Sequence, residues 1–431
     1  MILRLSSPVA RGILVLVATA IAASLAYSGI RNAVAAHEAG LNTLDGYTRA
    51  TQLEPDNAAN WSILGRYWQY NLENPDAQRA IHAYQKALTV DPYSAETWMD
   101  LGTAYESVGN ITAARNAFLQ AQRLYPISPE VSWRYGNFLL RQGDLDAAFA
   151  QFKHTVEVDP IRGAAAFSLA MRVNPDIHSV LDRVLPRSQE AYLTVISSLT
   201  ERDETDQAVA VWSQLDSLHP QFPLSKSYPL LEALIRKRQM TEALRVWNQA
   251  LVFGGVSRPP DPPGSLVWDG GFESDVGGGG FAWRNSSSLS GVGTAFDTNE
   301  KHSGKRSLRL TFNGLHNLDF AGVCQYIAVQ PATSYRFSAW VRTESLSTDQ
   351  GVRFGLHSIS DSDRSVAWTD DVHGTQPWAQ IRLPWTSGNE VHELQLCVSR
   401  LPSAQFDGKI HGSAWIDDVV LAPESAESAK Q

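Results

Sequence analysis

The stretch WMDLGTAYESVGNITAARNAFLQAQRLYP, residues 98–126, decides the fold of the first half of the chain. Its apolar residues recur at helical spacing, and Pro126 closes it because proline cannot continue a helix. The same order of residues returns 34 positions later, where Pro160 closes it, and an earlier copy ends at Pro92. A period of about 34 residues predicts stacked helical hairpins rather than one globular core.

Three units share large apolar residues, small residues that let two helices approach closely, and a closing proline. They are Trp61, Leu64, Gly65, Trp68, Ala80, Tyr84, Ala87 and Pro92; Trp98, Leu101, Gly102, Tyr105, Ala114, Phe118, Ala121 and Pro126; and Tyr135, Gly136, Leu139, Ala148, Phe152 and Pro160. This pattern resembles the tetratricopeptide repeat, a helix–turn–helix unit. Weaker copies occur at 43–55, 192–220 and 227–251, whereas 161–189 is helical in pattern but does not fit the repeat. We therefore expect helical repeats over residues 33–253.

The resemblance to tetratricopeptide repeats implies that a protein partner binds on the concave face of the array. The aromatic residues of the pattern stand at packing positions, so they predict core rather than a ligand site. No peptide-binding residue can be named from this half of the chain.

The N-terminus carries an uncharged apolar run, GILVLVATAIAASLAYSGI, at residues 12–30. As a helix it would measure about 28 Å, close to the thickness of a bilayer's hydrocarbon core. Arg4 and Arg11 precede it, so the positive-inside rule predicts a single-pass anchor (residues 1–32) in a bacterial inner membrane, with the rest of the chain in the periplasm. The alternative is a signal peptide cleaved near Ala33-Val34-Ala35, which would yield a secreted protein.

The composition excludes several classes of function. A formal net charge of −9 argues against a nucleic-acid partner. The chain contains no H-E-x-x-H, G-x-S-x-G or phosphate-loop pattern. The acidic pairs Asp370-Asp371 and Asp417-Asp418 would point to opposite faces of a strand, so neither forms a hydrolytic dyad by itself. We expect no enzyme, and a glycan-active enzyme of unrecognised type stands as an alternative.

The pattern changes after GGVSRPPDPPG, residues 254–264, which we interpret as a linker. Short segments of period-two alternation, separated by Gly, Ser and Asn clusters, then continue over 265–423. They predict an antiparallel β-sandwich followed by a disordered tail at 424–431. The expected architecture is therefore a transmembrane helix, an α-helical solenoid and a C-terminal β domain.

Five pieces of this second half resemble carbohydrate-binding modules with a galactose-binding-like jelly roll. They are Asp269-Gly270-Gly271-Phe272-Glu273, His302-Ser303-Gly304-Lys305-Arg306-Ser307-Leu308, Gln325-Tyr326-Ile327-Ala328-Val329, Trp378-Ala379-Gln380-Ile381 and Trp415-Ile416-Asp417-Asp418-Val419. The resemblance implies a structural calcium held by Glu273 and by Asp417 or Asp418, with backbone carbonyls near Ser303 and Lys305. The alternative is that these carboxylates cap a turn or pair with an arginine.

The resemblance also implies a glycan on one sheet face. Alternation and loop positions select these candidate ligand-binding residues: Tyr326, Trp340, His357, Gln395, Asn317 and Trp368. By the same alternation Cys324 and Cys397 face one side, and the jelly-roll order would make their strands neighbours. A cross-strand disulfide is expected, with two free buried thiols as the alternative.

The sequence thus predicts a membrane-anchored periplasmic binding protein. Its repeats would hold a protein partner, and its sandwich would contact a glycan or exopolysaccharide, in polysaccharide synthesis or export. The alternative is a purely structural scaffold that has no affinity for glycans.

Overall fold

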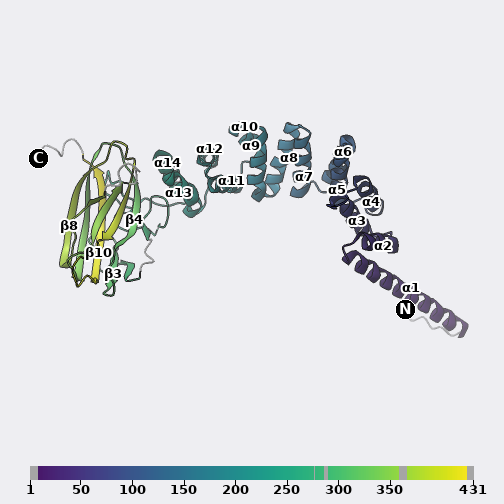
Figure 1. Cartoon of the computed structure of the whole chain (residues 1–431), viewed down its shortest axis with the longest axis horizontal. Coiled ribbons are helices and arrows are strands. Elements are labelled where there is room, and N and C mark those ends of the chain that lie inside the picture. Colours follow the sequence, from purple (N-terminus) through teal and green to yellow (C-terminus); the bar gives the residue numbers. More distant parts are fainter. Residues whose placement is uncertain (1–7, 276, 286–289, 359–365, 425–431) are drawn as a thin grey trace. The chain divides into compact units, whose positions relative to one another are not determined.

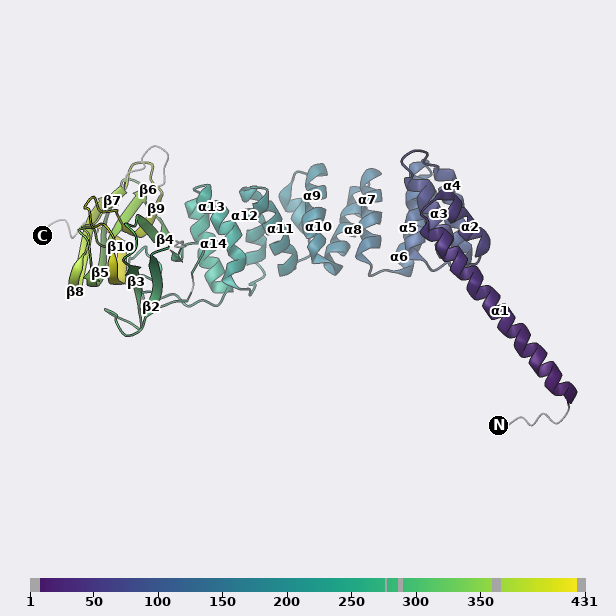
Figure 2. The same ribbon diagram turned by 60° about the horizontal axis from the view of Figure 1, so that its bottom comes forward.

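The computed structural model describes residues 8–275, 277–285, 290–358 and 366–424. Within these ranges fourteen α-helices precede ten β-strands (Figures 1 and 2). The chain divides into two compact units, residues 1–186 and 187–431. The predicted fold class is confirmed. The tail predicted to be disordered lies, apart from Glu424, outside the described residues.

The first unit contains the helices α1 to α10. Their bounds are α1 (Pro8–Gly40), α2 (Leu44–Leu53), α3 (Ala58–Tyr70), α4 (Ala77–Val90), α5 (Ala95–Ser107), α6 (Ile111–Leu124), α7 (Pro129–Arg141), α8 (Leu145–Val158), α9 (Gly163–Val173) and α10 (Ile177–Val184). The polar side chains of Asp76, Asn110 and Asp144 accept the first free N–H groups of α4, α6 and α8. The segment that did not fit the repeat forms the pair α9 and α10, preceded by a short 3-10 helix, Pro160–Arg162.

The glycines of the repeat lie where the two helices of one unit meet. A Cβ at Gly65 would stand 2.6 Å from the ring of Tyr84, and a Cβ at Gly136 would stand 2.9 Å from the ring of Phe152. Contacts this short are forbidden, so only glycine lets the buried rings pack against the neighbouring helix. Tyr84, Phe118, Tyr135 and Phe152 are buried in the core, as the sequence predicted. Trp68, Trp98 and Tyr105 are half-buried and pack against it, and Trp61 is half-buried as well.

Helix α1 runs without a break past residue 32 and into the first helical pair. Residues 11–40 are apolar and long enough to cross a membrane, with a mean hydropathy of 2.1 in the best window. The C-terminal part of the same helix packs on α2, where Ala35 is fully buried and a Cβ at Gly46 would lie 2.3 Å from the carbonyl oxygen of Glu38. One helix is thus both the candidate membrane span and part of the repeat array.

The second unit begins with four more helices, α11 (Gln189–Glu201), α12 (Thr205–Asp216), α13 (Tyr228–Arg236) and α14 (Met240–Phe253). Trp212 is fully buried among them and donates from Nε1 to Gln249 (2.8 Å). The segment expected as a linker, 254–264, contains no helix or strand. Its Asp261 accepts the backbone N–H groups of Asp269 and Gly270 at 3.0 and 2.9 Å, which ties this segment to the β domain.

The β domain is a sandwich of two five-stranded antiparallel sheets. The first sheet has the order β1 (Arg284–Asn285), β4 (Phe320–Ala328), β9 (Glu393–Arg400), β6 (Arg353–Ser358), β7 (Val366–Trp368). The second has the order β2 (Val292–Asp297), β3 (Ser307–Asn313), β10 (His411–Pro423), β5 (Ser334–Leu346), β8 (Gly374–Thr386). Alternate residues of both sheets fill the core between them, among them Leu310, Val323, Phe337, Val341, Phe354, Leu394, Leu396 and Ile416.

Candidate functional site

The outer face of the first sheet carries most of the residues predicted to bind a ligand. In the strand register Tyr326 of β4 stands opposite Gln395 of β9, and Gln395 stands opposite His357 of β6. The residues between them in sequence, such as Leu394 and Leu396, point into the core, so these three side chains lie in one row on the outer side. The fold therefore brings together three residues from three separate strands.

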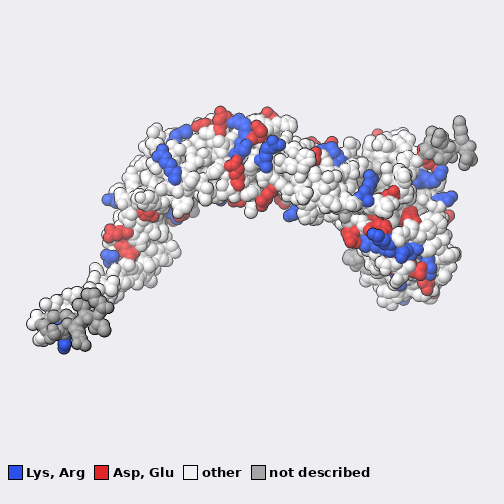
Figure 3. All heavy atoms as spheres, turned by 180° about the vertical axis from the view of Figure 1, so that it is seen from behind, with Lys and Arg blue, Asp and Glu red and all other residues white. Residues whose placement is uncertain are grey.

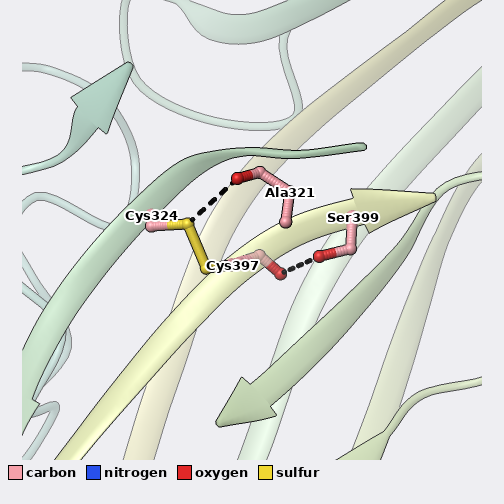
Figure 4. The surroundings of a disulfide bond; sticks show 4 residues. All are labelled: Ala321, Cys324, Cys397 and Ser399. Atoms are coloured by element: carbon pink, nitrogen blue, oxygen red, sulfur yellow. Dashed lines mark hydrogen bonds between the residues drawn. A yellow bond between two sulfur atoms is a disulfide. The ribbon is translucent and has the colours of Figure 1, made fainter. Parts of the chain in front are cut away.

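A second row lies beside the first. It runs across all five strands, in the order Arg284, Cys324, Cys397, Gly355 and Trp368. Figure 4 shows its middle, where Cys324 and Cys397 form a disulfide with an S–S distance of 2.09 Å. The cross-strand disulfide expected from the sequence is present, and it joins β4 to β9 directly beneath this face.

Gly355 has no side chain, and the rings of His357 and Trp368 fill the space above it. A Cβ there would stand 2.6 Å from His357 Nε2 and 2.7 Å from the ring of Trp368, so any other residue would displace both rings. The two rings meet edge to face, with centroids 5.5 Å apart. Burial lowers the pKa of His357, which keeps its imidazole neutral at neutral pH. Its Nε2 is buried and has no hydrogen-bond partner within the described residues, so it remains available to a ligand.

The charges near this face are paired. Arg284 lies over the ring of Tyr326, 4.6 Å from its centroid, and forms an ion pair with Glu232 of α13 at 2.7 Å. Arg238 lies 3.4 Å from the buried carboxylate of Glu393 on β9. On the side of the molecule shown in Figure 3, acidic and basic side chains of the sandwich are likewise interspersed.

Two predicted ligand-binding residues lie elsewhere. Trp340 belongs to β5 of the second sheet, where its ring stacks on His302 at 3.8 Å, so the structure does not bring it to Tyr326. Asn317 precedes β4, and its side-chain amide bonds to Ser403 and Arg400 at 2.8–3.0 Å. These bonds hold the exposed Asn317 against the buried Arg400, away from the row of Tyr326 and Gln395.

The carboxylates predicted to hold calcium gather around one loop. Glu273 and Asp417 accept backbone N–H groups of the loop 302–306 at 2.7 to 3.3 Å, and Asp418 accepts the Ser303 hydroxyl at 2.7 Å. Burial raises the pKa of Asp417, and the nearby charge of Asp418 raises it further. Among the residues that the structure describes, no three His, Cys, Asp or Glu side chains form a metal-binding group. The carboxylate oxygens accept N–H and O–H groups of the loop 302–306, which is the turn-capping role given above as the alternative to calcium.

Sequence reasoning missed Arg284, Gly355 and Glu232. A glycine inside an alternating strand was the available signal for Gly355, because such a residue often marks close approach of other groups. Glu232 and Arg284 lie on different elements and are 52 residues apart, so no local pattern connects them.

The first unit has a polar hollow of 390 Å³ along the helices that open successive repeats. It is lined by Tyr70, Thr103, Phe118, Glu130, Trp133, Arg134, Asn137 and Arg141. Asp100 joins three repeats there, with Arg66 at 2.7 Å on one side and Arg134 at 2.9 Å on the other.

Known protein families match both halves of the chain. Residues 99–160 match the family model for the tetratricopeptide repeat, and residues 264–402 match the model for a carbohydrate binding domain. The chain joins segments similar to these two families. Both are non-catalytic kinds of domain. Tetratricopeptide repeats suggest protein interaction, and the second segment suggests carbohydrate binding.

Solved structures resemble each half separately. The crystal structure of MamA is 19% identical, covers 46% of this chain and 89% of its own, and has a TM-score of 0.26. YrrB, described as a TPR protein with an unusual peptide-binding site, is 16% identical, with 49% and 94% covered and a TM-score of 0.26. The CBM22-1 xylan-binding domain of Xyn10C from Paenibacillus barcinonensis is 17% identical, with 38% and 97% covered and a TM-score of 0.26.

Proposed function

We propose that this protein is a non-catalytic, membrane-anchored scaffold that binds a protein partner on its repeats and a neutral polysaccharide on its sandwich. The observation that carries the proposal is the outer face of the first sheet, where Tyr326, Gln395 and His357 stand in one row and Trp368 packs with His357 over Gly355. An aromatic ring beside a few placed polar groups is the usual composition of a small-molecule site.

The charge state of this face favours a neutral glycan. Both carboxylates that border it, Glu232 and Glu393, have an arginine partner, and His357 is neutral at neutral pH. Among the described residues, these carboxylates and their arginines balance in charge, so they offer no excess positive charge to uronate or phosphate groups. The amide of Gln395 can donate to and accept from sugar hydroxyls, and the ring of Trp368 offers an apolar surface.

Affinity measurements on the full chain in detergent micelles test the glycan proposal. We expect binding to a soluble xylan or glucan but not to the acidic polysaccharide alginate. Gln395→Ala should weaken that binding about tenfold, the value of one lost hydrogen bond. Gln380→Ala, an exposed amide on the second sheet, is the matched control and should leave it unchanged. If no neutral polysaccharide binds, the purely structural scaffold becomes the better account.

The continuity of helix α1 supports an uncleaved anchor. Cleavage near Ala33-Val34-Ala35 would remove the part of α1 that carries the fully buried Ala35 and would leave α2 without most of its partner helix. We place the anchor in a bacterial inner membrane and the rest of the chain in the periplasm, in exopolysaccharide synthesis or export. The mass of the membrane-extracted chain tests this: an N-terminus at Ala36 or later would contradict the anchor. A cytosolic C-terminal tag would contradict the orientation.

The hollow in the first unit is the proposed protein site. It offers exposed Tyr70 together with Trp133 and the amide of Asn137, a set suited to an extended peptide. Peptides selected from a displayed library on the full chain should lose affinity with Asn137→Ala. They should retain it with Gln122→Ala, because Gln122 bonds to Gln151 on the second helices of the repeats. Equal losses in both variants would place the peptide elsewhere.

A further inference from the structure

We propose that helix α13 positions Tyr326 through Arg284. The last helical hairpin, α13 and α14, then contributes to glycan binding by holding this face in place. This inference rests on the proposed function of that face. It assigns a role to three residues, Glu232, Arg284 and Tyr326, of which only Tyr326 is expected to touch a sugar.

The link between helix and face is a fixed arginine. Both terminal nitrogens of Arg284 donate to the carboxylate of Glu232 at 2.7 Å, which is the two-point geometry of strong arginine pairs. Glu232 also accepts the backbone N–H of Gly280 at 2.9 Å, and Arg284 donates to the carbonyl of Gly280 at 2.6 Å. The guanidinium therefore has one orientation, and in that orientation it lies 4.6 Å from the ring centroid of Tyr326.

The helix itself is held by the glycine run 277–280. Tyr228 at the start of α13 packs on Gly279, where a Cβ would stand 2.4 Å from the ring, and donates to the carbonyl of Gly277 at 3.2 Å. Trp247 of α14 packs on Gly280, where a Cβ would stand 2.7 Å away. The run could serve as a flexible turn by its sequence alone, and here it provides the flat backbone on which the two helices dock.

An aromatic cluster and a second ion pair complete the contact. Trp247 meets Trp268 edge to face with centroids 5.5 Å apart, and Phe281 lies 6.1 Å from the same ring. Arg238, just after α13, reaches Glu393 on β9, one strand beyond Tyr326. In Figures 1 and 2, β4 correspondingly lies on the side of the sandwich nearest α13 and α14. The hairpin thus braces both strands that carry the row of Tyr326 and Gln395.

A charge-swap series in the full chain separates positioning from simple docking. Glu232→Gln should weaken binding of xylan or glucan about tenfold, because the arginine loses its two-point partner and Tyr326 its fixed cation. The double variant E232R/R284E restores an ion pair between helix and sandwich but leaves no cation over the ring. We expect it to recover the thermal stability lost in Glu232→Gln while its glycan affinity stays low. Glu242→Gln, which breaks a pair with Arg245 within α14, is the matched control and should change neither.

A second readout does not depend on glycan. The ring resonances of Tyr326, assigned with Tyr326→Phe in tyrosine-labelled full chain, should shift in Glu232→Gln and in the swap, and stay in place in Glu242→Gln. Recovery of full affinity in the swap, or an unmoved ring signal in Glu232→Gln, would overturn the inference. A wild-type chain that binds no neutral glycan but shows the ring shift would instead overturn the proposed function while leaving the positioning of Tyr326 intact.

Discussion

The two outer faces of the sandwich both carry tryptophans, but Trp340 and Trp415 of the second sheet have contacts on their ring faces that Trp368 of the first sheet does not show. On the second sheet Trp340 stacks on His302 at 3.8 Å, and Trp415 lies between Arg309 and Arg342 at 5.2 and 5.4 Å. Trp415 is also only 3% exposed. On the first sheet Trp368 has an edge contact with His357, and both rings pack over Gly355. We therefore take Trp368, whose ring has only an edge contact, as a better candidate platform than Trp340, whose ring face is stacked on His302.

The largest expected difference between the sheets comes from the disulfide, which crosslinks only the first of them within the described strands. Replacing both Cys324 and Cys397 by serine frees a loop of 73 residues and should lower the stability of the β domain by about 4 kcal/mol. Thermal unfolding of the full chain followed by near-UV circular dichroism measures this.

The first unit is the internal control, since residues 1–186 contain no cysteine. The unfolding temperature of this unit should be the same in the double serine variant and in the presence of a reductant. Unchanged unfolding of the β domain in the variant would show that the crosslink contributes nothing.

Calcium binding would act on the second sheet, because Asp417 and Asp418 lie on its strand β10. At a hundredfold excess over its dissociation constant, calcium should stabilise the β domain by about 2.7 kcal/mol. Calorimetry with calcium against a chelator measures the shift, and Glu273→Gln should abolish most of it. If calcium does not change the unfolding temperature of the β domain in the wild-type chain, the domain binds no structural calcium.

Alanine variants of one tryptophan on each sheet test which outer face binds the glycan. Trp368→Ala should weaken glycan binding about 30-fold, the size of a binding hot spot of about 2 kcal/mol. Trp340→Ala is the matched variant on the other sheet, and it should cost stability through lost stacking on His302 but leave affinity within about twofold. The reverse ranking of the two affinities, measured by affinity electrophoresis, would move the binding face to the second sheet.

The smallest effect expected is a pH dependence from His357. Its pKa is lowered by burial, so the unfolded chain binds the proton more readily than the folded one. Stability from this residue is present above the unfolded value near 6.5 and is lost as the pH falls below it. Chemical unfolding between about pH 7.5 and 5.5 should show this slope, and His357→Gln should flatten it. An identical slope in both proteins would assign the pH dependence to other groups.

The repeats and the sandwich could be predicted because each has a strong period. The spacing of Gly65, Gly102 and Gly136 defines the helical pairs. Alternation put Cys324 and Cys397 on the same side of their strands, and the jelly-roll order implied by the resemblance made those strands neighbours. Alternation could not separate Trp340 from Tyr326, because it tells which side of its own sheet a residue faces and not which sheet that is. The pair of Glu232 and Arg284 depends on tertiary packing between a helix and a strand, for which the sequence contains no periodic signal.

The docking of α14 on the sandwich has a consequence for anyone who excises the β domain at the proline-rich segment. A fragment beginning at residue 265 would lack Trp247, the ring that both Trp268 and Phe281 contact, and would expose two side chains that are 5% and 4% exposed in the intact chain. Such a patch promotes self-association. A soluble fragment should therefore begin ahead of Gln189, so that α13 and α14, and the two helices they pack on, stay with the sandwich.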